Sequence, residues 1–187
     1  MTVLYEDNHI IIVAKSAGEI VQGDKTGDTP LSEMVKAYIK ERYAKPGEVF
    51  LGVVHRLDRP VSGVVVFART SKALARLNEI FRTQEVHKTY WALVHHAPSE
   101  LKATLTHYLV RNEKQNKSYA YTHERPNAKK AVLDYEVIGH SDRYHLVEVH
   151  LHTGRHHQIR CQLAAIGCPI RGDLKYGAPR SNPDGSI

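Results

Sequence analysis

The sequence predicts an α+β fold in which a mostly antiparallel mixed β-sheet is flanked by helices. Alternation of apolar and polar residues with period two recurs in successive segments, and two of these, 131–138 and 144–151, are separated only by the turn residues Gly139–Asp142. Helical spacing of apolar residues is confined to three segments. Because strands cluster in hairpins and do not alternate regularly with helices, a doubly wound parallel sheet is disfavoured.

The first half of the chain is expected to contain strands and two helices. Residues 9–14 are apolar and rich in β-branched side chains, which is typical of a buried strand. Thr29 and Pro30 provide an N-cap and a first-turn proline for the helix that follows. The elements expected here are a strand at 9–14, a helix to about Tyr43, strands at 50–54 and 64–68, and a helix capped by Ser71 that ends at about Thr83.

The second half is expected to be richer in strands. Gly167 follows a segment in which Ile159, Leu163 and Ile166 recur with helical spacing, as at the end of a helix. Residues 179–187 are polar and read as a loop or loose tail. The elements expected here are strands at 87–95, 102–110, 117–122, 131–138 and 144–151 and a helix at 155–166.

Length and composition narrow the class of protein. The 187 residues are expected to form one domain, 1–187, with a core that needs neither disulfides nor metal. The formal net charge of +6 favours a polyanion as partner. Cys161 and Cys168 lack the spacing of a metal or redox motif, and no run is long and apolar enough for a membrane span. A reducing cytoplasm is therefore the expected location.

The segment His55–Gly63 is the most informative motif. It places Asp58 between Arg56 and Arg59, and nearby cations favour the ionised form of a carboxylate, which suits a nucleophile or an electrostatic stabiliser. The expected strands on both sides would hold this connection still. Taken alone, the cluster also fits a turn with an exposed ion pair.

Several motifs along the chain resemble those of the RluA-type RNA pseudouridine synthases, in the same order and over nearly the whole length. The family commonly has Pro where Ser16 stands and Thr where Val61 stands, but neither position carries the chemistry. The segments that carry the resemblance are Tyr5–Lys15, His55–Asp58 with Ser62 and Gly63, Lys88–Tyr90, Gly154–Arg160, and Gly172–Gly177.

The resemblance implies the pseudouridine synthase catalytic fold and an isomerisation without cofactor or metal. In this reaction the N-glycosidic bond of a uridine in RNA is broken, the base is turned, and the base is rejoined to the sugar through carbon. By the same matching, Asp58 is the catalytic aspartate and Arg160 is the cation that pairs with it. Tyr90 would stack against the target base and assist proton removal, although a tyrosine in a strand is most often a core residue.

The resemblance also implies a set of RNA-binding residues. Arg56 would enter the space vacated by the flipped uridine, and Leu163 would form an apolar wall of the pocket, unless it is simply a packing residue. Three cations are candidates for phosphate contacts, namely Arg59, Lys88 and Arg155. The expected partner is ribosomal or transfer RNA, bound by a monomer.

The family comparison carries expectations about the ends of the chain. Many members have an extra N-terminal RNA-binding domain, which is not expected here. Members usually continue with another strand beyond this point, so the C-terminus is expected to be truncated or to lack its last strand.

Three alternatives remain open at this stage. A metal site would use His150 and His152, or His156 and His157, although zinc normally needs three or four convergent ligands. A non-catalytic RNA-binding protein would use basic charge and exposed aromatic residues, as the segment around Tyr119 offers. A glycosidase-like hydrolase would need two carboxylates, and no second acid stands at a catalytic motif position.

Overall fold

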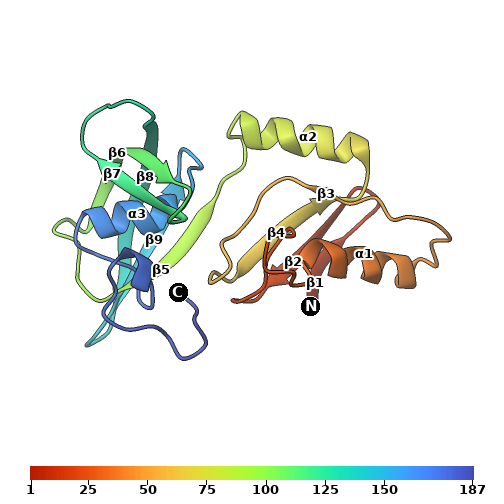
Figure 1. Cartoon of the computed structure of the whole chain (residues 1–187), viewed down its shortest axis with the longest axis horizontal. Helices are drawn as coiled ribbons and strands as arrows, with labels where there is room; N and C mark the ends of the chain where they lie inside the picture. The colour runs from red at the N-terminus through yellow and green to blue at the C-terminus, as the bar shows by residue number, and fades with distance from the viewer. The chain divides into compact units, whose positions relative to one another are not determined.

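The computed structural model describes residues 1–187 and divides them into two compact units. The first unit comprises Met1–Glu85 with Asp184–Ser186, and the second comprises Val86–Pro183 with Ile187. Each unit has its own sheet, in which every strand pairing is antiparallel, and its own hydrophobic core (Figure 1). The predicted α+β class is therefore confirmed. That the two units act as one domain stays a prediction.

The first unit is built on a four-stranded sheet with the strand order β1-β2-β4-β3. Helix α1 (Leu31–Arg42) packs its apolar stripe against one face of this sheet, because Leu31, Val35 and Ile39 are buried among the inward side chains of β2 and β4. The strands are β1 (Thr2–Glu6), β2 (Ile10–Lys15), β3 (Gly52–Val53) and β4 (Gly63–Ala68).

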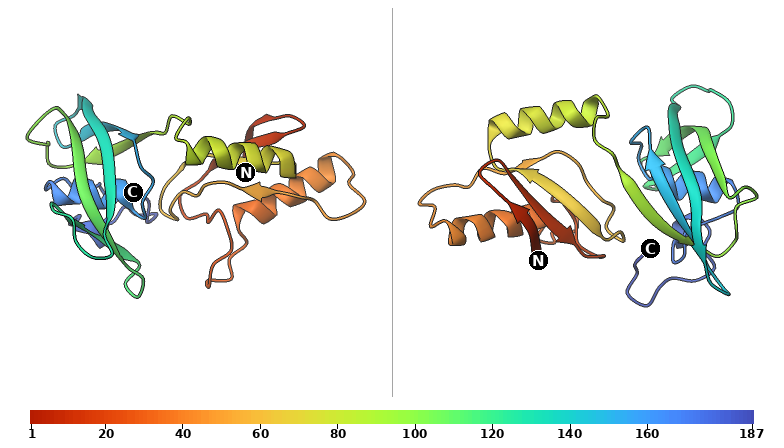
Figure 2. Two further views of the ribbon diagram at one scale, coloured as in Figure 1. Left: turned by 90° about the horizontal axis from the view of Figure 1, so that it is seen from above. Right: turned by 180° about the vertical axis from the view of Figure 1, so that it is seen from behind.

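Helix α2 (Ser71–Arg82) lies across the same sheet from α1, as Figures 1 and 2 show. Gly52 of β3 allows its close approach, because a Cβ atom at this position would lie 2.7 Å from the Cδ1 atom of Leu74. Strand β3 pairs through Gly52 and Val53 with the end of β4, so the connection from residue 54 to residue 62 begins and ends in the sheet. This connection carries the Asp58 motif.

The second unit is built on a five-stranded sheet with the strand order β5-β9-β8-β6-β7. The hairpins β6–β7 and β8–β9 are joined by the pairing of β6 with β8, and β5 completes the sheet by pairing with β9. The strands are β5 (Thr89–Val94), β6 (Lys102–Asn112), β7 (Lys117–Tyr121), β8 (Lys129–His140) and β9 (His145–Leu151).

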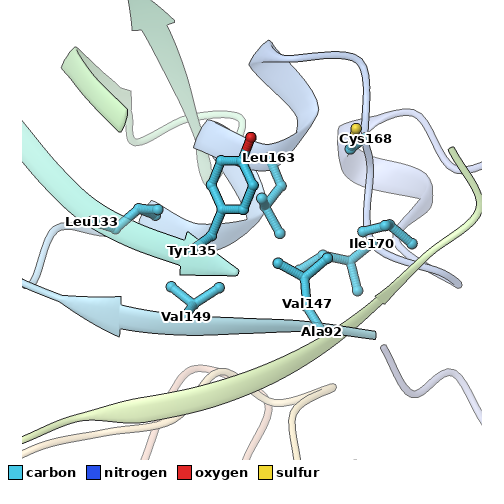
Figure 3. Packing of buried hydrophobic residues seen from close by; sticks show 9 residues of the cluster. Ala92, Leu133, Tyr135, Val147, Val149, Leu163, Cys168 and Ile170 are labelled. Atoms are coloured by element: carbon cyan, nitrogen blue, oxygen red, sulfur yellow. The ribbon is translucent and has the colours of Figure 1, made fainter. Parts of the chain in front are cut away.

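Helix α3 (Gln158–Ala165) covers one face of the second sheet. Figure 3 shows Leu163 pointing from this helix toward Tyr135 and Val147 of the sheet, and Leu163 is completely buried. A short 3-10 helix, η1 (Leu174–Tyr176), follows and brings Tyr176 against Cys161 of α3 in a smaller core cluster. The residues of the Gly154–Arg160 and Gly172–Gly177 motifs are thereby placed side by side.

The main differences from the sequence-based expectations lie at element ends. Strand β1 was not predicted, and the strand expected at 50–54 is only two residues long. The N-cap of α1 is Pro30 and no side chain caps this helix, whereas α2 is capped by Thr70, whose side chain accepts a hydrogen bond from the Ala73 amide. Both predicted caps, Thr29 and Ser71, were therefore wrong by one residue.

None of the helices has the length and hydropathy that a transmembrane span requires.

Candidate active site

The connection that carries Asp58 is held by a buried lysine. Lys15 follows Ile11 and Val13 on the inward face of β2, and only 2% of its surface is exposed. Its Nζ atom lies 3.1 Å from the carbonyl oxygen of Asp58, 2.5 Å from that of Val61, 3.2 Å from that of residue 59 and 3.1 Å from that of residue 16. Since an ammonium group has three N–H donors, at least one is shared between two carbonyls. Lys15 thus fixes the backbone on which the carboxylate of Asp58 stands.

Burial lowers the pKa of Lys15, while the charges of Glu19 and Asp58 oppose this effect. The pKa is lowered because the cation loses favourable hydration in the protein interior, where backbone carbonyl dipoles are its main ligands. The ammonium adds a donor to carbonyls that already accept backbone amides, those of Asp58 and residues 16 and 59, and supplies one to the carbonyl of Val61.

Arg59 has a structural role in the first unit. Its guanidinium donates to Asp28 at 2.7 Å, to Asp24 at 3.1 Å and to the hydroxyl of Thr26 at 2.9 Å. Its carbonyl oxygen accepts the Gly18 amide at 2.7 Å. These contacts tie the polar loop before α1 to the Asp58 connection, and they commit donors of Arg59 to carboxylates. A phosphate contact by Arg59 stays a prediction that this geometry does not favour.

His55 anchors the start of the same connection. Its Nε2 atom accepts a hydrogen bond from the Val66 amide of β4 at 3.0 Å, and its ring stacks on Phe81 of α2 with the centroids 5.0 Å apart. An imidazole nitrogen that accepts an amide proton carries no proton of its own, so His55 holds its place as the Nδ1–H tautomer. Arg56, next along the chain, is exposed.

Arg160 forms a buried, bidentate ion pair with Asp173. Its Nε atom donates to one carboxylate oxygen at 2.8 Å and its Nη2 atom donates to the other at 2.9 Å. The side chains are 9% and 1% exposed, respectively. A bidentate contact of this kind fixes the plane of the guanidinium as well as its position. The ion pair joins α3 to the turn that precedes η1.

Tyr176 completes the surroundings of Arg160. Its ring centroid lies 5.2 Å from the Arg160 Cζ atom, and its hydroxyl accepts the Ser118 amide at 2.8 Å and lies 2.9 Å from Nδ1 of His157. Burial raises the pKa of Tyr176 to about 12, with the hydrogen bond from Ser118 opposing the shift. The hydroxyl is therefore protonated at neutral pH.

The loop that precedes α3 is held by Gln158, which is buried. Its Oε1 atom accepts from the Thr153 hydroxyl and from the Arg155 amide, both at 2.9 Å, and its Nε2 atom donates to the Val132 carbonyl at 3.1 Å. The Nε atom of Arg155 donates to the carbonyl oxygen of Lys130 at 2.9 Å. The glutamine of the third motif is thus a structural residue that fixes the neighbouring Arg155.

Lys88 and Tyr90 lie on or just before strand β5. The Lys88 ammonium lies 3.3 Å from the position that a Cβ atom on Gly154 would take, so the lysine lies directly beside this glycine. Burial lowers the pKa of Lys88. Tyr90 packs against the main core cluster of the second unit without being completely buried. Lys88 therefore lies close to the backbone that precedes Arg155 in the second unit.

Leu163 lies in the core, and His150 and His152 lie beside carboxylates. Leu163 is completely buried and packs in the core, so its contact with RNA stays a prediction that this geometry does not favour. His150 lies 3.1 Å from Glu148, and His152 lies 2.6 Å from Asp134. No group of three or more histidine, cysteine, aspartate or glutamate side chains is placed to bind a metal ion.

The structure thus brings the candidate residues together in two sets. Asp58 and the two arginines beside it belong to the first unit, whereas Tyr90 and Arg160 belong to the second. The pairing of Asp58 with Arg160 stays a prediction.

Two residues of the site were missed from the sequence. Lys15 could have been found because it continues the inward alternation of Ile11 and Val13, and Asp173 because it is the only acid among the cations of residues 155–180.

Comparison with known proteins places these motifs in a family. The chain matches the family model described as RNA pseudouridylate synthase over residues 9–165. It is 34% identical to an uncharacterized RNA pseudouridine synthase of Chlorobaculum parvum, over 98% of this chain and 58% of the relative. It is 32% identical to a mitochondrial pseudouridylate synthase of Xenopus tropicalis, over 97% of this chain and 63% of the relative.

A solved structure gives the same result for the fold. Human RNA pseudouridylate synthase domain containing 4 superimposes with a TM-score of 0.81 at 28% identity, and the match covers 97% of this chain and 72% of the human one. The chain spans about three fifths of the length of the curated relatives it matches.

Proposed function

Because the chain belongs to the RNA pseudouridylate synthase family, we propose that it isomerises uridine to pseudouridine in RNA. The bond between N1 of the base and the sugar breaks, and a bond between C5 and the sugar forms. C5 loses a proton and N1 gains one, so the reaction is balanced without an oxidant, a reductant or another substrate. The observation that carries the proposal is the Asp58 motif on a connection fixed by Lys15.

Asp58 is the proposed nucleophile. The ionised carboxylate of Asp58 would attack the nucleoside. Lys15 binds the backbone carbonyl of the same residue and so fixes the backbone from which this side chain extends. Arg160 would stabilise this carboxylate once the base excludes water from the pocket. Asp173 supports the assignment, since it occupies the Nε–Nη2 edge of the guanidinium and sets the direction in which its Nη1 atom points.

Binding of the target requires extraction of a nucleotide from its stack. Tyr90 would stack on the extracted base, and Arg56, which is exposed on the Asp58 connection, would fill the space left behind. Lys88 and Arg155, which share one neighbourhood, would contact phosphates beside the target.

The proposed substrate is ribosomal or transfer RNA. A relative from Buchnera aphidicola, 32% identical over 94% of this chain, is named ribosomal large subunit pseudouridine synthase C, which favours ribosomal RNA. A monomeric state and a cytoplasmic location stay predictions, and one relative is named as mitochondrial.

The proposal is tested by incubating the protein with purified ribosomal RNA and, separately, with transfer RNA. Pseudouridine is then measured by chromatography of the digested nucleosides. New pseudouridine in the ribosomal sample supports the proposal, and mapping of the modified position identifies the target. Binding of both RNAs without any new pseudouridine would favour the alternative of a non-catalytic RNA-binding protein.

A further inference from the structure

The outer face of the second sheet carries a cluster of tyrosines and cations at its β7 edge. Leu109 of β6 and Ala120 of β7 are paired and pack inward beneath α3, so the neighbouring pair of Tyr108 and Tyr121 faces outward. Tyr119 lies two residues before Tyr121 on β7 and therefore shares this outward face. We call this surface the tyrosine platform, defined by Tyr108, Lys117, Tyr119, Tyr121, Arg125 and Lys130.

Cations lie over two of the platform's rings. The Arg125 Cζ atom is 3.8 Å from the centroid of the Tyr121 ring, and the Lys117 Nζ atom is 5.3 Å from that of Tyr119. Tyr119 itself is 38% exposed. Aromatic rings and guanidinium planes are the surfaces on which unpaired nucleic-acid bases stack, and the adjoining ammonium groups suit the phosphates between them.

Charge distinguishes this end of the sheet face from the other. Residues 111–130 contain six lysines and arginines and only two acids, Glu113 and Glu124. The opposite end of the same face carries Glu136, paired with Glu148 in the sheet register, and Trp91, whose indole donates to Glu148 at 3.0 Å. The excess of cations therefore favours binding of an RNA strand at the platform over the Trp91 end.

The third motif contacts the platform strand β7 from the opposite face of the sheet, on the side of α3. His156 lies 2.8 Å from the hydroxyl of Ser118, which is buried on the inward face of β7, and 3.0 Å from the side chain of Asn116, which precedes β7. Arg155 donates to the carbonyl of Lys130, which belongs to the platform. The chain segment that leads into Arg160 is thus bound directly to the strands that carry the tyrosines.

We propose that the tyrosine platform binds unpaired nucleotides of the RNA substrate that lie outside the target uridine. One base would stack on Tyr119 and another on the Arg125–Tyr121 pair, with phosphates on Lys117 and Lys130. This inference rests on the proposed function and adds to it a structural class of substrate, namely a loop or single-stranded stretch of RNA instead of a continuous duplex.

The test is fluorescence anisotropy with two probes, a labelled 12-nucleotide oligouridylate and a labelled 12-base-pair RNA duplex. The wild-type chain is expected to bind the single strand more tightly. Tyr119→Ala should weaken single-strand binding roughly tenfold and leave duplex binding unchanged, because stacking on this ring is lost. Trp91→Ala is the matched control, since it removes an exposed aromatic ring from the acidic end of the same face, and it should bind like wild type.

A second variant tests the cations. Lys117→Gln combined with Lys130→Gln should weaken binding of the single strand and reduce the slope of log affinity against log salt by about 1.4, given about 0.7 for each phosphate contact. Circular dichroism of each variant verifies folding.

Equal single-strand binding by wild type and Tyr119→Ala would overturn the proposal. So would equally tight binding of polyglutamate to the wild type at the same salt concentration, which would indicate a surface for acidic proteins. Failure of the proposed function is distinguishable, since RNA would then bind to the platform without forming pseudouridine.

Discussion

At the scale of single residues, the site is defined less by its charged motif than by the groups that hold the motif in place. Asp58 lies on a connection whose carbonyl oxygens converge on the Lys15 ammonium. The guanidinium of Arg160 is oriented by Asp173. In both cases a buried charge is matched by several polar partners, which is the condition under which such burial is tolerated.

Lys15→Met tests the first of these supports. Methionine keeps much of the apolar stem but removes the ammonium, so the carbonyls of Asp58 and Val61 lose a donor in a buried place. We expect the free energy of unfolding to fall by about 1–3 kcal/mol and turnover to fall while RNA affinity is retained. Urea unfolding and pseudouridine assays measure the two effects. Unchanged turnover in a folded variant would show that the Asp58 connection does not need Lys15.

Asp173→Asn tests the second support. The variant leaves the Arg160 guanidinium buried beside a neutral amide, so the free energy of unfolding should fall by about 3 kcal/mol. Combining it with Arg160→Gln replaces the ion pair by two amides and should recover part of that stability. Activity should not return in the double variant, because Asp58 loses its proposed cation. Recovery of both stability and activity would mean that Arg160 serves only the fold.

The sequence motifs identified residues of the site but not the partners that these residues bind. The motifs marked Gln158 and Arg160 as a group, but only the structure assigns Gln158 to the loop around Arg155 and pairs Arg160 with Asp173. The sequence marks Asp173 as the only acid among the cations of residues 155–180, but it does not show which of these cations Asp173 binds.

At the scale of elements, periodicity was a good guide to strands and helices but not to their ends. The long strands β6 and β8 were predicted because their alternation extends over many residues. The start of α3 was placed three residues early, because His157 adopts a left-handed conformation with φ of 52° and residues 155–157 form the loop that Gln158 holds. Apolar spacing does not report such a local backbone requirement.

The contact between α3 and η1 makes a prediction about alkaline pH. Burial raises the pKa of Cys161 to about 11 and that of Tyr176 to about 12, compared with ordinary values of 9.0 and 10.0. As the pH rises above 9, the unfolded chain therefore releases protons that the folded chain retains, and stability falls. Thermal melts at pH 8 and pH 10.5 should show a smaller loss for Cys161→Ala than for wild type. An equal loss of thermal stability in both proteins would show that the Cys161 thiol does not contribute to the alkaline destabilisation.

At the scale of the whole molecule, the net charge of +6 and the family membership indicate the same kind of partner. Both compact units contribute motif residues, since the first holds Asp58 and the second holds Tyr90 and Arg160. The fold class was predictable from the hairpin pattern alone. The division into two units was not predicted, although each core draws on its own half of the sequence, residues 11–67 in the first unit and residues 92–170 in the second.

The central claim is that the carboxylate of Asp58 performs the chemistry on uridine. The most direct measurement is the single-turnover rate of pseudouridine formation by Asp58→Asn, with Asp142→Asn as a control that removes an exposed carboxylate. We expect Asp58→Asn to lose roughly a thousandfold or more in rate, equivalent to about 4 kcal/mol, and to retain its affinity for RNA. Turnover by Asp58→Asn within tenfold of the wild-type rate would contradict the claim.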